Sequence, residues 1–86
     1  MIKKKFKIMS EQGLHARPAA LFVQTISKHS ASVIVESEGQ RVNGKSIIGL
    51  LTLCLQEGTE LTVEVDGSNE AEVMQEIEQL FTKESL

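Results

Sequence analysis

The sequence contains no tryptophan or tyrosine and only three phenylalanines, so the aromatic side chains that stack on nucleic-acid bases are scarce. With 12 acidic and 9 basic residues its net charge is -3, which argues against a basic nucleic-acid-binding face. The single cysteine, Cys54, cannot form an internal disulfide and fits a reducing compartment. No hydrophobic run reaches membrane-spanning length. We therefore expect a cytoplasmic protein with no nucleic-acid partner and no membrane insertion.

The length of 86 residues predicts a single domain over 1–86. A chain of this size can hold a packed core but hardly a deep cleft. The sequence has no linker, repeat or low-complexity stretch that would divide it. Any chemistry is therefore expected on the surface.

Alternating polar and apolar residues predict half-buried strands at 5–8, 32–36 and 59–65. Glu38-Gly39 is a turn signal, and 40–43 is long enough for a return strand that forms a hairpin with the strand before it. The sequence thus supplies four short strands for one antiparallel sheet.

Three helical patterns complete the chain. The first helix has apolar residues at i, i+3, i+4 and i+7, namely Ala19, Phe22, Val23 and Ile26. A short middle helix runs from Ile47 to about Cys54. The last helix has a similar stripe, formed by Val73, Met74, Ile77, Leu80 and Phe81. The order β-α-β-β-α-β-α predicts an α+β fold, a four-stranded antiparallel sheet with three helices on one face.

A few polar or reactive side chains are expected to have purely structural roles. Asn69 and Glu72 form a plausible capping box at the start of the last helix. His29 is expected to be a solvated cation near the end of the first helix, favoured there by the helix dipole. Cys54 is expected to be a small core residue.

The stretch GLHARPAA, residues 13–20, begins the first helix and places a histidine and an arginine at an anion-binding helix start. His15 lies at or next to the N-cap, and Pro18 lies in the first turn, where its missing N–H costs no helical bond. The free N–H groups of that turn, those of Ala16 and Arg17, and the helix dipole favour an anion. The Arg17 guanidinium suits phosphate.

This arrangement predicts a nucleophilic imidazole nitrogen on His15 beside a receptor for a phosphoryl group. The alternative is an ordinary helix start, with Arg17 as a solvated surface residue. No residue nearby completes a catalytic triad, and the sequence has no metal-ligand cluster, so we expect no metal, no cofactor and no independent catalyst.

The middle helix carries more apolar surface than a core-facing stripe requires. Ile47, Ile48 and Leu51 form an arc beside the core positions, and Leu21 would extend it if the two helices lie side by side. Such a surface suggests docking of a protein partner, although a small domain could simply bury this helix on most sides. Ser46 is a natural N-cap for the same helix.

Two stretches, GLHARPAA and VNGKSIIGLL, at matching spacing and with the final EAEVMQEIEQLF helix, resemble the HPr family. HPr proteins are histidine-containing phosphocarriers of the bacterial phosphoenolpyruvate-dependent sugar phosphotransferase system (PTS), and the resemblance runs the full chain. It implies an open-faced β-sandwich. It also implies that His15 accepts a phosphoryl group on Nδ1 from phosphorylated Enzyme I and passes it to sugar-specific Enzyme IIA proteins, with Arg17 binding the phosphate. The implied docking patch consists of Ala16, Ala20, Leu21, Ile47, Ile48 and Leu51.

The resemblance gives Ser46 a regulatory role. It matches a serine that an ATP-dependent HPr kinase/phosphorylase phosphorylates in many Gram-positive bacteria, and the phosphorylated form binds a CcpA-like transcription regulator in carbon catabolite repression. A phosphate there would preserve the helix start but place negative charge beside the docking patch, which should repel an acidic Enzyme I surface. The alternative is an ordinary capping serine.

The sequence leaves open three functions from different classes. The first is the sugar phosphocarrier, expected to be a monomer. The second is a regulatory binding module that acts through phosphorylated Ser46. An HPr-like relative with that role has a residue other than histidine at the position of His15, which favours the first function. The third is a carrier in a nitrogen-related phosphotransfer chain, which only its donor protein would distinguish.

Overall fold

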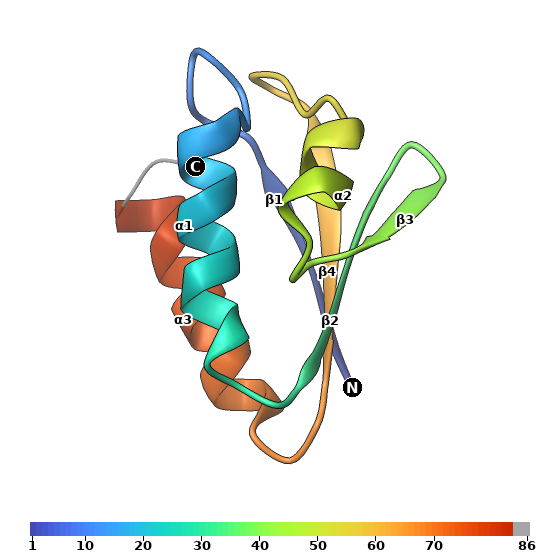
Figure 1. Cartoon of the computed structure of the whole chain (residues 1–86), viewed down its shortest axis with the longest axis vertical. Helices are drawn as coiled ribbons and strands as arrows, with labels where there is room; N and C mark the ends of the chain where they lie inside the picture. The colour runs from blue at the N-terminus through green and yellow to red at the C-terminus, as the bar shows by residue number, and fades with distance from the viewer. Residues whose placement is uncertain (84–86) are drawn as a thin grey trace.

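The computed structural model describes residues 1–83 and has the predicted order of elements (Figure 1). Its strands and helices are β1 (Ile2–Lys7), α1 (Ala16–Ser27), β2 (Ser32–Ser37), β3 (Gln40–Asn43), α2 (Ile47–Thr52), β4 (Glu60–Asp66) and α3 (Glu70–Lys83). The predicted α+β class and β-α-β-β-α-β-α order are confirmed.

The four strands form one antiparallel sheet in the order β1-β4-β2-β3. The β4 strand therefore lies between the first two strands, and its apolar side chains face those of β2, as in the pairs Val33–Val65 and Val35–Val63. The β2–β3 hairpin turns at Glu38 and Gly39, which both have positive φ, 51° and 82°. Two such residues suit the tight turns of β-hairpins, as the sequence signal predicts.

The helices cover one face of the sheet, and α1 packs against both α2 and α3 (Figure 1). The aromatic rings of Phe6 and Phe81 stack with their centroids 4.4 Å apart, which joins β1 to α3. Each valine, leucine, isoleucine, methionine or phenylalanine side chain buried in this layer contributes about 1.5–3 kcal/mol relative to leaving it exposed. The core contains Ile8, Leu14, Ala19, Phe22, Ile26, Ala31, Val33, Val35, Leu50, Leu55, Leu61, Val63, Val65, Val73, Met74, Ile77, Leu80 and Phe81.

The other face of the sheet is open and charged. Glu64, at the centre of this face on β4, pairs with Lys3 of β1 at 3.3 Å and with Arg41 of β3 at 2.5 Å. Arg41 also contacts Glu36 at 3.3 Å. The Arg41 guanidinium, with help from the Lys3 ammonium, lowers the pKa of Glu64 below its usual range although desolvation opposes this. Cross-strand pairs of opposite charge thus line this face, which no helix of residues 1–83 covers.

The end of α2 differs from the prediction. The helix stops at Thr52, and Cys54 is exposed rather than part of the core. Cys54 has a positive φ of 52°, a left-handed conformation that turns the chain out of the helix. The helical periodicity that placed Cys54 beside Leu50 therefore does not hold at this position, although Leu50 itself is buried.

The start of α3 also differs. Asn69 donates its side-chain N–H to His29 at 3.0 Å, while its buried Oδ1 has no hydrogen-bond partner within residues 1–83. The predicted capping box of Asn69 with Glu72 is therefore wrong. The carboxylate that bonds to the backbone at this helix start is that of Glu70, whose Oε1 accepts the N–H of Gly67 at 3.2 Å.

Candidate functional site

His15 is the N-cap of α1, but its side chain does not cap the helix. Its backbone is extended (φ -91°, ψ -168°), and its carbonyl accepts the N–H of Ala19 at 3.0 Å, so the helix starts directly after it. The imidazole makes no capping hydrogen bond and is exposed. The side chain that the sequence singles out is thus an exposed ring at the start of α1.

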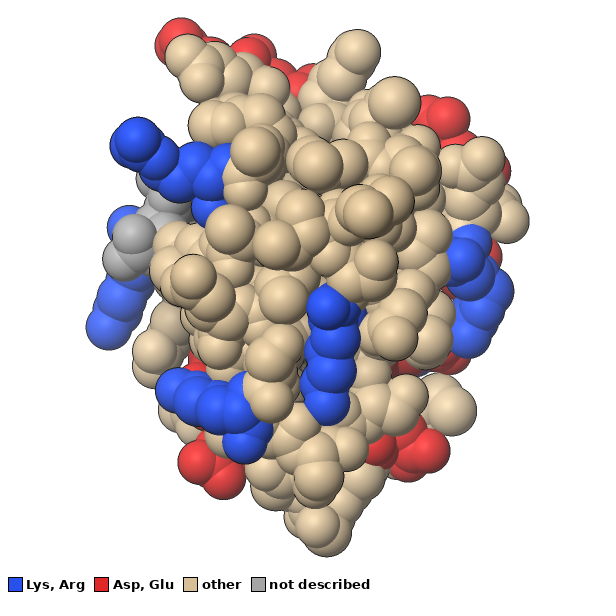
Figure 2. Space-filling view, in the orientation of Figure 1, with Lys and Arg blue, Asp and Glu red and all other residues tan. Residues whose placement is uncertain are grey.

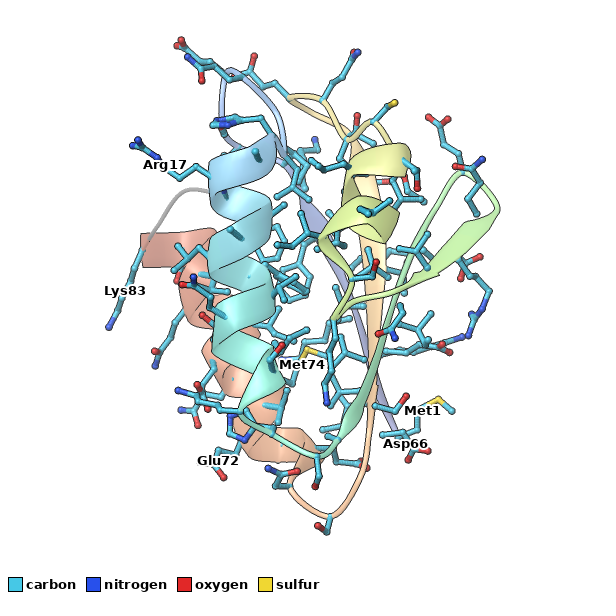
Figure 3. The ribbon with its side chains drawn as sticks, in the orientation of Figure 1. Met1, Arg17, Asp66, Glu72, Met74 and Lys83 are labelled. Atoms are coloured by element: carbon cyan, nitrogen blue, oxygen red, sulfur yellow. The ribbon has the colours of Figure 1, made fainter. Side chains whose placement is uncertain are left out.

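The first turn of α1 leaves backbone donors beside this ring. Ala16 and Arg17 occupy the first two helical positions, where N–H groups have no intrahelical acceptor, and within residues 1–83 neither N–H donates a hydrogen bond. Pro18 follows and is buried. The Arg17 side chain is exposed and extends outward from the start of α1, on the side away from α2 (Figure 3). Two N–H groups and the helix dipole can therefore receive an anion next to His15.

Ser46 begins α2 in a different way. Its backbone is also extended (φ -109°, ψ 114°), but its Oγ accepts the N–H of Gly49 at 3.0 Å. This confirms that Ser46 caps α2. Ser46 itself is half-buried.

The patch that the HPr resemblance implies for docking is exposed on α2. Ile48 has 77% of its surface accessible, and Ile47 and Leu51 are also exposed, although Leu50 between them is buried in the core. Exposure of three large apolar side chains on a six-residue helix is more than the core requires. Figure 2 views this side of the molecule, where uncharged side chains occupy most of the surface and acidic groups lie at its margins.

The α1 members of the patch are less uniform. Ala16 is exposed and Ala20 is half-buried, whereas Leu21 is partly buried and packs against the core. Because α1 lies against α2, these residues continue the apolar surface toward His15. Met9, 61% exposed, is an apolar residue of the preceding loop that the sequence analysis missed. The alternation of β1 could have found it, since Met9 follows the buried Ile8 and so points the other way.

His29 differs from the sequence expectation and from His15. Its side chain is only 11% exposed, and its Nε2 lies 2.7 Å from Glu76 of α3. Burial raises the pKa of the Glu76 carboxyl, but hydrogen bonds from Lys28 and His29 outweigh this and hold that pKa below its usual range. His29 therefore links the end of α1 to α3 through a largely buried side chain, rather than extending into solvent.

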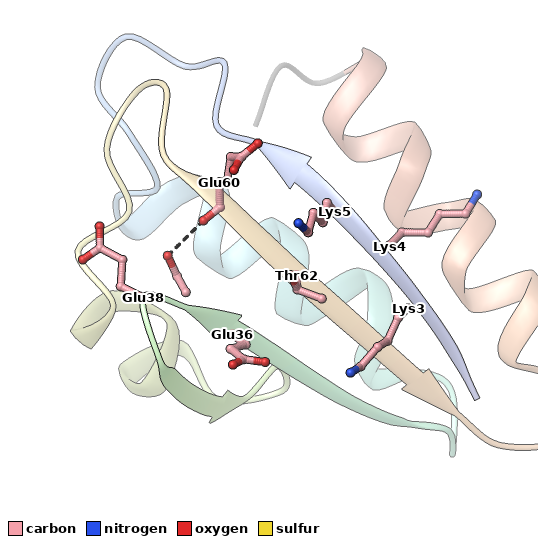
Figure 4. A pocket seen from close by; sticks show the side chains of 8 residues that line it. Lys3, Lys4, Lys5, Glu36, Glu38, Glu60 and Thr62 are labelled. Carbon is pink, nitrogen blue, oxygen red and sulfur yellow. Dashed lines mark hydrogen bonds between the residues drawn. The ribbon is translucent and has the colours of Figure 1, made fainter.

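A surface hollow lies on the open face of the sheet, away from the helices (Figure 4). It is a shallow groove of about 490 Å³ lined by Lys3, Lys4, Lys5, Glu36, Ser37, Glu38, Glu60 and Thr62. Among residues 1–83, no group of three or more histidine, cysteine or carboxylate side chains is arranged to hold a metal ion. In the same part of the chain, no helix has the length and apolar character needed to cross a membrane.

Comparison with known proteins identifies the family of this chain. A family model described as the PTS HPr component phosphorylation site matches residues 2–83. The histidine-containing phosphocarrier protein of Mycoplasma has a similar structure, with a TM-score of 0.94 and 30% identity over 99% of this chain and 97% of that one.

Two further solved structures extend the comparison. HPr from Thermoanaerobacter tengcongensis is 39% identical over 95% of this chain and 92% of that one, with a TM-score of 0.91. The catabolite-repression protein Crh of Bacillus subtilis, described as an intertwined dimer with a swapped domain, is 38% identical over 100% of this chain and 99% of that one, with a TM-score of 0.77. Phosphocarriers and a regulatory protein thus share the fold described above.

Proposed function

Because this chain belongs to the PTS HPr family, whose members are phosphocarriers rather than catalytic enzymes, we propose that it carries a phosphoryl group on His15. The observation that carries the proposal is the uncapped start of α1, where an exposed imidazole lies next to unused backbone donors. A family model of a phosphorylation site spans this segment.

The proposed transfer has two steps that mirror each other. The Nδ1 atom of neutral His15 attacks the phosphorus of phosphorylated Enzyme I, and an N–P bond forms as the bond to the donor breaks. The N–H groups of Ala16 and Arg17, together with the Arg17 guanidinium, share the new negative charge. An acceptor nucleophile on Enzyme IIA then takes the phosphoryl group and restores neutral His15. Because the site is on the surface, the phosphoryl group remains accessible to the next protein.

The docking patch is the proposed contact surface for both Enzyme I and the Enzyme IIA proteins. Its exposed residues on α2 lie beside α1, so a partner seated there would cover the start of the helix that His15 caps. Apolar side chains with few charges among them suit the centre of a protein interface. We propose that the protein is a monomeric, single-domain carrier that works in the cytoplasm.

Ser46 is the proposed site of regulation by an HPr kinase/phosphorylase. Ser46 is half-buried at the start of α2, directly before the exposed Ile47 and Ile48. A phosphate there would add close to two negative charges beside the docking patch while remaining favourable to the helix dipole. It would therefore weaken docking without unfolding the domain, and could present a new surface to a CcpA-like regulator in carbon catabolite repression.

A second candidate function is a regulatory binding module that does not carry phosphate on a histidine. The likeness to Crh of Bacillus subtilis supports this candidate. His15 argues against it, because a purely regulatory module has no use for an exposed nucleophile beside two free N–H groups. A carrier in a nitrogen-related phosphotransfer chain would keep the same site and differ in its donor protein.

The deciding experiment is phosphate transfer from phosphoenolpyruvate through Enzyme I to this protein and to His15→Ala, followed by intact-mass measurement. The proposal predicts a gain of one phosphate that is absent from the variant. No gain in either folded protein, with a known HPr accepting phosphate in the same mixture, would favour the regulatory module. Replacing Enzyme I with the donor of a nitrogen-related chain tests the third candidate.

The chemistry of the modification gives an independent control. A phosphate on an imidazole nitrogen is acid-labile, whereas a serine phosphate is not. Brief acid treatment should therefore remove the phosphate that came from phosphoenolpyruvate. A phosphate that survived the acid would show that the acceptor is not His15.

A further inference from the structure

The loop 9–14, which leads from β1 to His15, is fixed at its first end by backbone hydrogen bonds. The N–H of Ile8 donates to the carbonyl of Thr59 at 3.0 Å, and the N–H of Gly58 donates to the carbonyl of Ile8 at 2.8 Å. Ile8 itself is buried in the core. The loop therefore leaves the sheet from a fixed point.

The other end of the loop is held directly before the reactive residue. The N–H of Leu14 donates to the carbonyl of Leu55 at 2.8 Å, and the side chains of both leucines are buried. The N–H of His15 then donates to the carbonyl of Gly13 at 3.1 Å. The backbone of His15 is thus placed by a bond only one residue away.

Gly13 is the residue that allows this close approach. Its φ is +73°, and a Cβ atom added there would lie 2.4 Å from the carbonyl oxygen of Leu55 and 3.0 Å from the Cα of Gln56. Both neighbours are backbone atoms, which cannot rotate aside as a flexible side chain can. Any L-residue with a side chain would push the loop away from Leu55.

We propose that Gly13 is a positioning residue for phosphoryl transfer, because its missing Cβ lets the Leu14–Leu55 bond set the place of His15. The proposal rests on the proposed function of His15. The imidazole must meet the donor phosphorus while the N–H groups of Ala16 and Arg17 face the same phosphoryl group. A displacement of roughly 1 Å in such an arrangement can cost about a hundredfold in rate.

The test compares Gly13→Ala with Gly39→Ala. Gly39 has a similar φ of +82° but nothing within 4 Å of an added Cβ, so this control carries the backbone strain without the collision. Phosphate transfer from phosphorylated Enzyme I is measured over a range of concentrations for both variants. Hydrogen exchange of the Leu14 amide reports on the bond to Leu55.

We expect Gly13→Ala to lower kcat by about tenfold to a hundredfold, with KM within about twofold because the docking patch is unchanged. Exchange of the Leu14 amide should be faster in this variant. Gly39→Ala should leave both the kinetics and the Leu14 exchange as in the wild type. Unchanged kcat in a Gly13→Ala protein with fast Leu14 exchange would overturn the proposal.

A second variant decides the question if Gly13→Ala does not fold. Chemical synthesis can replace the amide of Leu14 by an ester, which removes the N–H donor and leaves Gly13 and every side chain in place. The same loss of kcat is expected, and wild-type kcat would overturn the proposal. A wild-type protein that takes no phosphate would overturn the proposed function as well, whereas wild-type transfer with insensitive variants would overturn only the role of Gly13.

Discussion

The starts of α1 and α2 are built from similar backbone but leave different groups free. Ser46 accepts the N–H of Gly49, the third helical position of α2. The same position in α1 is Pro18, which has no N–H, and the cap residue His15 makes no side-chain bond. Where a side chain of the protein accepts an N–H of the first turn, that group serves only to stabilise the helix. Where the cap residue accepts none of them with its side chain, the N–H groups are available to an external anion.

This difference separates the two proposed modification sites physically. A phosphate on His15 would use N–H groups that are otherwise unused, and it is expected to be passed on. A phosphate on Ser46 would be attached to the oxygen that already accepts the N–H of Gly49 in α2, close to the docking patch. The first site therefore suits transfer, and the second suits control of docking.

Between the two helix starts, the largest change in docking is expected from a negative charge at position 46. Ser46→Asp should raise the KM for phosphorylated Enzyme I about tenfold at low salt, with kcat little changed, because a charge at the rim of an interface slows association. The effect should shrink at high salt as the charge is screened. Transfer kinetics at two ionic strengths measure both.

Ser46→Asn is the matched control for this substitution. Asparagine has nearly the shape of aspartate and is an equally good N-cap, but it has no charge. We expect its KM to stay near the wild-type value. If the two variants weakened transfer equally, the shape of the side chain at position 46, and not its charge, would be responsible.

A smaller effect is expected when each cap is removed. Ser46→Ala should lower the free energy of unfolding by about 1 kcal/mol, because the N–H of Gly49 loses its acceptor. His15→Ala should change it by less than about 0.5 kcal/mol, because His15 makes no capping bond, although phosphate uptake is lost. Urea denaturation measures both variants. An equal loss of stability in the two would contradict the distinction between the helix starts.

Much of the fold could be predicted because the relevant signals are local. The alternation in 32–36 and 59–65 and the spacing of apolar residues in the first and last helices set which face is buried, and the structure buries those faces. The position of His15 at the helix start follows from the same local pattern with Pro18. The resemblance to HPr added the identities of the proposed partners to a site that the residues already outlined.

The features that the sequence did not reveal depend on distant contacts. Asn69 reaches His29, 40 positions away in the chain, and His29 reaches Glu76, 47 positions away, so neither could be assigned from its neighbours. Cys54 fits the helical period but lies in a left-handed turn, because the chain must leave α2 for Leu55 to meet Leu14. Local periodicity cannot report such tertiary requirements.

The start of α3 differs from both, because a carboxylate there makes the free energy of unfolding depend on pH. The expected effect is the smallest of those considered. The ammonium group of Met1 and the N–H of Gly67 hold the pKa of the Glu70 carboxyl below its usual range. The unfolded chain therefore binds this proton more readily than the folded chain does. The stabilisation is present above about pH 4.5 and is lost as the pH falls through the lower folded value.

Glu70→Gln should consequently be less stable than the wild type at neutral pH and should lose less stability on acidification to about pH 3. Glu72→Gln is the matched control, since Glu72 is an exposed carboxylate of the same first turn and removing it changes the interaction with the helix dipole in the same way. Urea denaturation of the three proteins from neutral pH to about pH 3 separates the contributions. If the two variants had the same pH dependence, the Met1 and Gly67 contacts would contribute nothing beyond the dipole. Phosphate uptake at His15 should be unchanged in both, because the start of α3 supplies no group to the start of α1.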